Sequence, residues 1–349
     1  METMKAVVKY ALADDKVELR DMPVPSIGDN DVLLRVEAAG VCGSDIEMWR
    51  NHFTYHVNTP VIQGHEFCGV IERVGADVQG WKAGDRVVSE TSAYVCGQCR
   101  FCRSGDYNMC PSRLGYGYGT NGAFTRYVRV RQQILHRIPE GLSFDEAAIT
   151  EPACVAYNAL VVRSRIHPGD VVVVIGPGPI GINCLQMAHI AGAAKLFMIG
   201  TPADEKRFRV AAQVCPRAVM LRGSSEESSA AVMDATSGLG ADVVVDAAGN
   251  SETLRLSLAL VRRLGLITKI GWGPAPVGFS LDLLLTKAIT LQGTYGHNRQ
   301  AWDNVIRLLD SRILNLKPLV SHVLPITRWR EGYELVESRQ AVKVILKQE

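Results

Sequence analysis

A strand-like run that leads into a glycine-rich turn is the sequence feature that most limits how this chain can fold. Five apolar residues, Val171–Ile175, are followed at once by Gly176-Pro177-Gly178-Pro179-Ile180-Gly181 and then by a helical pattern. This spacing between a strand and a helix predicts a dinucleotide-binding turn. The first glycine allows the tight turn, the second lets the backbone approach a pyrophosphate, and the third lets helix and strand pack closely. The phosphates then meet free N–H groups at the positive end of the helix.

Downstream of this turn, strand-like and helix-like segments alternate up to about residue 293. Continuous apolar, β-branched strands separated by helices are typical of a parallel sheet that is covered on both faces. The pattern makes a ligand-free βα turn the weaker interpretation of the glycines. We predict strands at Val171–Ile175, Leu196–Ile199, Ala218–Leu221, Val243–Asp246, Leu266–Ile270 and Ile289–Gly293, with helices at about 180–191, 203–213, 226–236 and 251–261.

The first 150 residues follow a different pattern. Residues 5–9 and 31–38 alternate apolar and polar side chains, as half-buried strands do, and short strands with glycine-containing turns continue through 69–75. This pattern predicts an irregular β-rich domain with functional residues on its loops. The last fifty residues, with a helix near 299–311 and an alternating tail at Ala341–Leu346, could return to this domain and make it discontinuous.

Length and charge limit the class of protein. A chain of 349 residues favours two domains, and a formal net charge of +2 argues against a nucleic-acid or polybasic membrane surface. No apolar run approaches the length of a membrane span, and residues 1–5 lack the apolar segment of a signal peptide. We therefore expect a cytoplasmic protein whose nine cysteines serve metal or thiol chemistry rather than disulfides.

Four of these cysteines form the most specific motif of the chain. Cys96, Cys99, Cys102 and Cys110 are separated by two, two and seven residues, which fits a four-thiolate zinc site in a segment too polar to hold itself by packing. An iron–sulfur cluster is the competing interpretation, because Pro111 follows Cys110 as in ferredoxins, but the last interval there is three residues. A closed shell of four thiolates leaves no open position, so this zinc would be structural.

A second metal-capable stretch runs from Cys42 to Glu66. It offers a thiol at Cys42, an imidazole at His65 and a carboxylate at Glu66, and zinc accepts all three. Taken singly, Cys42 is more typical of a small buried hydrophobic residue. Because the four-cysteine motif shows that the chain handles zinc, the three residues together predict an open, catalytic metal site.

The end of the second predicted strand bears on the choice of cofactor, because an acidic residue there binds the ribose 2′-hydroxyl of NAD. Here Ile199 is followed by Gly200 and Thr201, with no acid at the tip. A hydroxyl with nearby bases such as Arg207 would accept the 2′-phosphate of NADP. Alternatively, Asp204 reaches back to the ribose and favours NAD, and the sequence leaves both cofactors open.

In this order, the two zinc motifs and the dinucleotide turn resemble the zinc-dependent medium-chain dehydrogenase/reductase (alcohol dehydrogenase) family over essentially the whole chain. The pattern is most similar to the sorbitol (polyol) and threonine dehydrogenase branches. The resemblance implies a GroES-like β-rich catalytic domain at residues 1–155 and 296–349 and a Rossmann doubly wound nucleotide-binding domain at 156–295. It also implies one catalytic and one structural zinc ion per chain, NAD or NADP as cofactor, and further cofactor contacts at Ala248 and Gly271.

The same resemblance assigns the groups around the catalytic zinc. Cys42 and His65 match metal ligands, and Glu66 and Glu151 match acidic positions at or beside the metal, without deciding which of the two binds directly. A zinc ion held in this way acts as a Lewis acid toward an alcohol, and the nicotinamide accepts a hydride.

Two further residues receive supporting roles from the resemblance. Ser44 matches a hydroxyl that bonds the substrate oxygen and begins a proton relay, and Asp45 matches a carboxylate that holds His65 in one tautomer. Capping of a turn is the alternative interpretation of both. Where the relay often continues through a histidine, this chain has Glu47, so the role of Glu47 is open.

Signals for the substrate conflict. Trp49 and Glu151-Pro152 resemble the polyol branch, whereas Gly293–His297 is more similar to the threonine branch. We predict a zinc-dependent oxidoreductase that transfers a hydride from a secondary alcohol, polyol or sugar-derived, to NAD(P) and yields the ketone. The alternatives are a threonine, amino-alcohol or simple secondary-alcohol dehydrogenase, or a catalytically silent nucleotide-binding relative, while the cysteine motif disfavours a zinc-free quinone reductase.

We expect a small-molecule alcohol or ketone substrate, no nucleic acid and no membrane as partners, and by resemblance a homodimer or homotetramer that pairs through the strand near Ile289–Thr294.

Overall fold

Two compact units make up the chain. The structure is a computed structural model that describes residues 2–273 and 275–348. One unit consists of Met1–Glu151 and Asn298–Glu349, and the other of Pro152–His297. Each unit has its own sheets and its own hydrophobic core.

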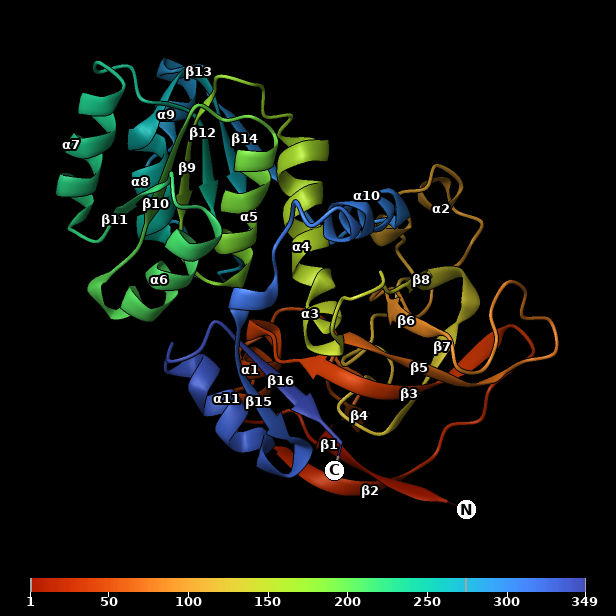
Figure 1. The fold of residues 1–349 in the computed structure, drawn as a ribbon. Coiled ribbons are helices and arrows are strands. Elements are labelled where there is room, and N and C mark those ends of the chain that lie inside the picture. Colours follow the sequence, from red (N-terminus) through yellow and green to blue (C-terminus); the bar gives the residue numbers. More distant parts are fainter. Residues whose placement is uncertain (1, 274, 349) are drawn as a thin grey trace. The chain divides into compact units, whose positions relative to one another are not determined.

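The first unit is built mainly from antiparallel strands (Figure 1). A seven-stranded sheet has the order β15-β16-β3-β5-β6-β8, with β7 also paired to β3, and a smaller sheet has the order β2-β1-β4. Its strands are β1 (Thr3–Lys9), β2 (Val17–Pro23), β3 (Asp31–Gly40), β4 (Val61–Ile62), β5 (Glu66–Val74), β6 (Arg86–Ser89), β7 (Tyr127–Arg131), β8 (Leu135–Arg137), β15 (Val320–Pro325) and β16 (Lys343–Lys347). Its helices are α1 (Gly43–Trp49), α2 (Arg100–Arg103), α3 (Phe144–Ala148), α10 (Arg299–Asp310) and α11 (Trp329–Glu337), and α4 (Thr150–Tyr157) begins in it.

The C-terminal strand β16 joins the sheet of the N-terminal segment. It pairs antiparallel with the end of β3, where Ile345 lies opposite Gly40 and Leu346 lies opposite Ala39. Since β3 also pairs with β5, the start of β5 and the tail of the chain lie on either side of the same strand end. This register brings the last residues of the chain beside the segment that contains Cys42.

The second unit contains a six-stranded parallel sheet in the order β11-β10-β9-β12-β13-β14, with helices alongside it (Figure 1). Buried β-branched and leucine side chains of the strands and of α8 form its core. Its strands are β9 (Val171–Ile175), β10 (Lys195–Ile199), β11 (Val219–Leu221), β12 (Ala241–Asp246), β13 (Val261–Lys269) and β14 (Thr290–Gly293), and its helices are α5 (Pro179–Ile190), α6 (Glu205–Val214), α7 (Ser225–Ala235), α8 (Ser251–Leu260) and α9 (Asp282–Thr286). The parallel sheet with its alternating helices confirms the predicted Rossmann arrangement.

Strand β13 differs most from its prediction, because it begins at Val261 rather than at Leu266. An irregularity in the register between Ala241 and Val243 lets Val261 pair with Ala241 five residues earlier than expected. Helix α9 was not predicted, since its five residues are too few to show a helical period.

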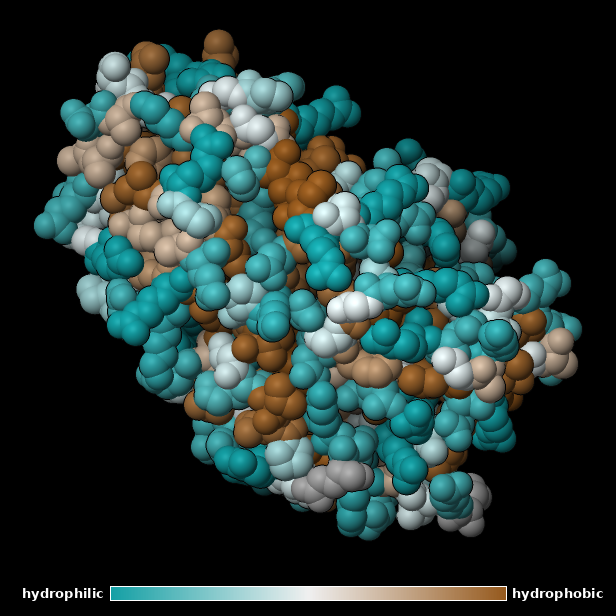
Figure 2. All heavy atoms as spheres, in the orientation of Figure 1, coloured by the Kyte–Doolittle hydropathy of each residue, from teal (hydrophilic) through white to brown (hydrophobic). Residues whose placement is uncertain are grey.

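The surface that the described residues form is mostly hydrophilic on the face drawn in Figure 2. Figure 2 shows hydrophilic side chains interleaved with smaller hydrophobic areas on the face drawn. Among the residues that the structure describes, no helix combines the length and the apolar character needed to cross a membrane.

Candidate active site and metal centres

The four-cysteine motif folds into a compact thiol cluster in the first unit. Cys99 is the N-terminal cap of the short helix α2, Cys102 is the third residue of this helix, and Cys110 follows a single 3-10 turn. The sulfur of Cys96 accepts a hydrogen bond from the N–H of Cys99, and the sulfur of Cys110 accepts one from the N–H of Cys96. Backbone groups within fifteen residues of chain therefore hold the thiols in place.

The spacing of the sulfurs fits a tetrahedral zinc ion. Cys96 Sγ lies 4.0 Å from Cys102 Sγ and 3.6 Å from Cys110 Sγ, and all four cysteines are free thiols. Zinc–sulfur bonds of about 2.3 Å in a tetrahedron require sulfur–sulfur edges of about 3.8 Å. The four ligand atoms lie within 4.8 Å of one another.

The thiols of this cluster differ in acidity. Hydrogen bonds from the backbone N–H groups of Gln98 and Cys99 lower the pKa of Cys96 to about 6. Burial is the main cause that raises the pKa of Cys102 to about 12, and the neighbouring thiol of Cys99 adds to this effect. Cys96 is therefore a thiolate at neutral pH and is ready to bind a metal ion.

The second candidate site brings Cys42, His65 and Glu66 together in the first unit. Cys42 directly precedes α1, His65 directly precedes β5, and Glu66 is the first residue of β5. Their ligand atoms lie within 4.8 Å of one another. His65 and Glu66 are buried, whereas Cys42 is partly exposed. The structure thus assembles the mixed ligand set that the sequence predicted as an open metal site.

Negative groups surround the imidazole of His65. Burial by itself lowers the pKa of His65, but Cys42, Asp45 and Glu151 outweigh it and raise this pKa to about 10. Asp45 Oδ1 lies 4.0 Å from His65 Nδ1, and both atoms are buried without a hydrogen-bond partner among the described residues. The other oxygen of Asp45 accepts a hydrogen bond of 2.9 Å from the N–H of Cys42. Such surroundings suit a cation, which supports a metal ion at this position.

Lys343 is part of this site, although sequence reasoning missed it. Its ammonium group donates to both carboxylate oxygens of Glu66, with Nζ 2.6 Å from Oε2, and to the carbonyl of Val41 at 3.1 Å. Both side chains of the ion pair are almost completely buried. Gly40 leaves the space for this carboxylate, since a Cβ there would lie 2.6 Å from Glu66 Oε2. The one available signal was a lysine in the otherwise apolar run Ala341–Leu346.

The remaining predicted residues of the site lie nearby with different degrees of support. Glu151 is buried and acts electrostatically on both His65 and Lys343, but it lies outside the three-residue ligand group. Ser44 lies in the first turn of α1 and is partly exposed. Burial raises the pKa of Glu47, which lies one turn further along α1.

The glycine-rich turn of the second unit has the geometry that its spacing predicts. Gly176 has a φ of +101°, and a Cβ there would lie 3.1 Å from atoms of Ala248. A Cβ on Gly181 would lie 1.9 Å from the carbonyl oxygen of Gly176, so only glycine allows the close packing of α5. Gly178 is the N-terminal cap of α5, and a Cβ there would meet nothing within 4 Å. The middle glycine therefore faces open space, as approach of a pyrophosphate requires.

The loop after β10 is shaped by Asp204. One oxygen of Asp204 accepts hydrogen bonds from the backbone N–H of Thr201 at 3.0 Å and from its hydroxyl at 2.8 Å. The other oxygen lies 3.6 Å from Arg207. A Cβ on Gly200 would lie 2.8 Å from the ring of Pro177, so the strand tip and the glycine turn touch. The loop thus presents a hydroxyl, a carboxylate and an arginine close to the predicted cofactor turn.

The two other predicted cofactor residues lie at the same edge of the sheet. Ala248 follows β12, and its N–H donates to Asp246 Oδ1 at 3.2 Å. Gly271 follows β13, and its carbonyl oxygen accepts from Lys269 Nζ at 2.7 Å.

Comparisons with known proteins agree with these features. The sequence matches the alcohol dehydrogenase GroES-like domain over residues 28–140 and the zinc-binding dehydrogenase family over residues 179–311. It is 35% identical over 344 residues to a sorbitol dehydrogenase of Halalkalibacterium halodurans, with 98% of this chain and 99% of that protein covered. It is 34% identical over 346 residues to a D-arabitol-phosphate dehydrogenase of Enterococcus avium, with 99% of this chain and 97% of that protein covered.

A solved structure gives the same result. The alcohol dehydrogenase TADH from Thermus sp. ATN1 superimposes with a TM-score of 0.88 at 32% identity, and the match covers 99% of this chain and 100% of that chain. These matches confirm the predicted fold class and the predicted class of enzyme. The chain belongs to the zinc-dependent medium-chain alcohol dehydrogenase family.

Proposed function

We propose that this chain oxidises a secondary alcohol of a polyol or polyol phosphate to the ketone, with NAD or NADP as hydride acceptor and one catalytic zinc ion. The observation that carries this proposal is the grouping of Cys42, His65 and Glu66, because a thiol, an imidazole and a carboxylate within 4.8 Å form a mixed set that leaves a coordination position open. The sugar-derived substrate is supported by similarity to a sorbitol dehydrogenase and a D-arabitol-phosphate dehydrogenase.

The first unit would hold the catalytic zinc through Cys42 and His65 together with one of two glutamates. Bound there, zinc supplies Lewis acidity that lowers the pKa of the substrate hydroxyl. Both oxygens of Glu66 already accept from Lys343, and each keeps a second lone pair with which it could bind the metal. Glu151, which acts on both His65 and Lys343, is the other carboxylate that would complete the set.

Asp45 and Ser44 would support the chemistry without binding the metal. A small rotation of the His65 ring would bring Nδ1 into hydrogen-bond range of Asp45 Oδ1, now 4.0 Å away, and would fix the tautomer that leaves the other ring nitrogen free. The partly exposed hydroxyl of Ser44, two residues after Cys42, would accept the proton of the substrate hydroxyl and pass it to solvent. Glu47 lies where the usual relay histidine would be, and burial raises the pKa of its carboxyl group.

The second unit would bind the cofactor. We assign residues 156–295 to cofactor binding and residues 1–155 with 296–349 to catalysis, which lies within a few residues of the two compact units. Gly176, Gly178 and Gly181 would receive the pyrophosphate, and the loop Gly200–Arg207 would face the adenosine ribose. Because Asp204 is hydrogen-bonded to Thr201 yet keeps one oxygen near Arg207, the loop offers groups for either NAD or NADP.

The structural zinc ion would occupy the thiol cluster Cys96, Cys99, Cys102 and Cys110, which makes two zinc ions per chain. The sulfur spacing of 3.6 and 4.0 Å supports this assignment. A cytoplasmic location is part of the proposal, since thiols that bind zinc must stay reduced.

Self-association through β14 is also part of the proposal. This strand ends the parallel sheet and pairs only with β13 among the described residues, so its outer edge offers unpaired backbone groups. Leu283 and Leu285 on α9 and Leu291 on β14 are 40%, 80% and 37% exposed. A homodimer or homotetramer would cover them, and elution as a monomer in gel filtration would contradict this part.

A substrate panel tests the function. Sorbitol, xylitol, arabitol phosphate, threonine, 2,3-butanediol and simple secondary alcohols would be assayed anaerobically with zinc-loaded enzyme and with each cofactor. We expect reduction of one cofactor with a polyol or polyol phosphate. Turnover with threonine alone would move the chain to the alternative branch, and no turnover of any secondary alcohol would overturn the proposal.

A further inference from the structure

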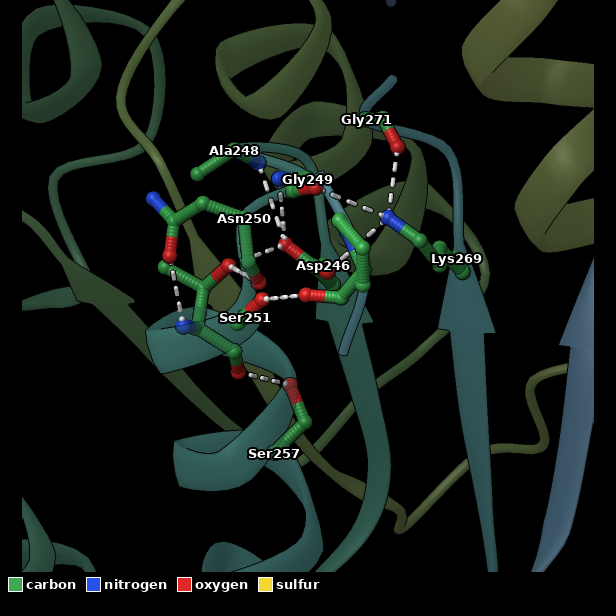
Figure 3. Close-up of polar contacts among 10 residues, drawn as sticks. Asp246, Ala248, Gly249, Asn250, Ser251, Ser257, Lys269 and Gly271 are labelled. Carbon is green, nitrogen blue, oxygen red and sulfur yellow. Dashed lines mark hydrogen bonds and ion pairs between the residues drawn. The ribbon is translucent and has the colours of Figure 1, made fainter. Parts of the chain in front are cut away.

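Lys269 occupies an unusual position near the end of the parallel strand β13. Its ammonium nitrogen donates to the carbonyl oxygens of Gly249 at 3.2 Å and Gly271 at 2.7 Å, and it lies 3.5 Å from Asp246 Oδ2 (Figure 3). An ammonium group has three N–H donors, and three acceptors of the chain surround this one. The side chain is therefore occupied by groups of the protein itself.

Asp246, at the end of the neighbouring strand β12, organises the first of the two loops that Lys269 contacts. Its Oδ1 accepts hydrogen bonds from the N–H groups of Ala248 at 3.2 Å and Gly249 at 2.8 Å and from the hydroxyl of Thr253 at 3.0 Å. The carboxylate is completely buried. Its other oxygen has no hydrogen-bond partner among the described residues, so Lys269 supplies the compensating charge.

The two loops after β12 and β13 touch each other through their backbones. Gly249 has a φ of +84°, and a Cβ there would lie 2.4 Å from the carbonyl carbon of Gly271. A Cβ on Gly273 would lie 2.1 Å from the carbonyl oxygen of Gly249. Only glycine allows such an approach. Figure 3 shows Lys269 reaching from β13 to both loops, so one side chain fastens them together.

These loops lie beside the point where a dinucleotide binds in sheets of this topology. In the strand order β11-β10-β9-β12-β13-β14, the chain proceeds toward one edge of the sheet from β9 and toward the other edge from β12. Ligands bind outside the carboxyl ends of the strands at such a switch point. Gly176 of the glycine turn and Ala248 are in contact there. The fold consists of two mononucleotide-binding halves, and the glycine turn belongs to the first. The loops fastened by Lys269 belong to the second half, which would receive the nicotinamide mononucleotide.

We propose that Lys269 is a positioning residue for the nicotinamide half of the cofactor. It holds loops 247–250 and 270–273 in one arrangement through the two carbonyl contacts and the Asp246 ion pair, without contacting the cofactor. The inference rests on the proposed function, because it assumes that the second unit binds a nicotinamide dinucleotide.

Lys287 provides a matched control within the same sheet. Its ammonium group also caps three chain oxygens, the carbonyls of Leu258, Ala259 and Val261, at 2.8, 2.9 and 2.9 Å. Both lysines are partly exposed. Val261 begins β13 and Lys287 precedes β14, so this second lysine lies at the amino ends of the strands, opposite to the loops of interest.

The experiment compares Lys269→Met with Lys287→Met by calorimetric titration of the full chain. Each protein is titrated with NADH and NADPH, and with ADP-ribose or 2′-phospho-ADP-ribose, which lack the nicotinamide. We expect Lys269→Met to weaken binding of the preferred dinucleotide at least tenfold while the fragment binds within twofold of the wild type. Lys287→Met should change neither affinity. A general loss of stability would instead lower the melting temperature and weaken binding of the dinucleotide and of the fragment alike.

Several outcomes would overturn the inference. One is wild-type dinucleotide affinity in Lys269→Met, and another is an equal loss for dinucleotide and fragment. If Lys269→Met does not fold, Lys269→Gln, which keeps two N–H donors for the carbonyls, is compared in the same way, and a selective loss of at least threefold is required. A wild-type protein that binds the fragment but neither dinucleotide would overturn the proposed function itself.

Discussion

The two candidate metal centres of this chain are built in opposite ways. The thiol cluster takes four like ligands from fifteen consecutive residues, and three of the four thiols are partly exposed. The site of Cys42, His65 and Glu66 takes three unlike ligands from two segments and is supported by Asp45 and by Lys343 from the end of the chain. A closed shell can be set by local backbone contacts and by the metal, whereas a site with an open position also needs support from distant parts of the protein.

The strongest test of this difference is Cys42→Ser. We expect kcat/KM to fall at least about a thousandfold, because the catalytic zinc loses its thiolate and its Lewis acidity disappears from the site. Zinc content should fall from two ions per chain to one, as measured by atomic emission, while cofactor binding stays unchanged. Cys184→Ala, which removes a buried thiol in α5, is the control and should keep both zinc ions and activity. Full activity of Cys42→Ser would remove this residue from the mechanism.

Lys343→Met tests whether the open site depends on distant support. In the zinc-depleted protein, we expect the free energy of unfolding to fall by about 3–5 kcal/mol, because Glu66 keeps a buried charge without its partner. The double variant Glu66→Gln with Lys343→Met should recover most of this loss. Lys347→Met is the matched control, since Lys347 also lies on β16 but forms a more exposed ion pair with Asp145, and it should cost about 1 kcal/mol or less. Denaturant titrations measure all three, and equal costs for Lys343 and Lys347 would contradict the assigned role.

Cys99→Ser tests the closed site. One zinc ion should be lost and the melting temperature should decrease, because the segment 96–110 depends on the metal for its order. Turnover at 20 °C should stay within about threefold of the wild type, since the thiol cluster has no open position for a substrate. Loss of activity comparable to that of Cys42→Ser would show that the thiol cluster takes part in the reaction.

The pH dependence of zinc uptake should distinguish the two sites most finely. The pKa of Cys96 is lowered to about 6, so its zinc-binding thiolate persists down to about pH 6 and is lost as the pH falls further. The pKa of His65 is raised to about 10 in the metal-free protein, so zinc must displace a proton there at neutral pH. Cys42→Ser and Cys99→Ser isolate the two sites after chelator treatment. Between pH 7 and pH 9, we expect zinc affinity to rise about tenfold per pH unit at both sites, because His65 at one site and Cys102 in the cluster, whose pKa is raised to about 12, must each lose a proton. Below pH 6, the zinc affinity of the cluster should fall more steeply with pH than above it, because Cys96 is then protonated as well. A slope at the cluster that does not change near pH 6 would contradict this difference.

Much of the fold could be predicted from the sequence because its signals are local. The run Val171–Ile175 is β9 with the predicted limits, and four of the other five strands of the parallel sheet begin and end within two residues of their predicted limits, whereas β13 is longer. Buried β-branched runs and glycine spacing act over a few residues, and their patterns survive any tertiary arrangement. The thiol cluster was predictable for the same reason.

Lys343 and Lys269 could not be assigned from the sequence, because each acts across strands. A lysine in an apolar strand indicates a buried charge but does not name its partner. The pairing of β16 with β3 places Lys343 beside Glu66, 277 residues away along the chain. The pairing of β12 with β13 places Lys269 beside Asp246 and between two loops.

The sequence by itself determined the parallel sheet, the dinucleotide turn, the thiol cluster and the identity of the residues that could bind a second metal ion. Only the tertiary structure decided that Glu66 is held by Lys343, that Asp204 is hydrogen-bonded to Thr201, and that Lys269 fastens two loops. The reason is physical: short-range patterns are set by backbone geometry, whereas a buried charge takes the partner that strand register and sheet order bring to it.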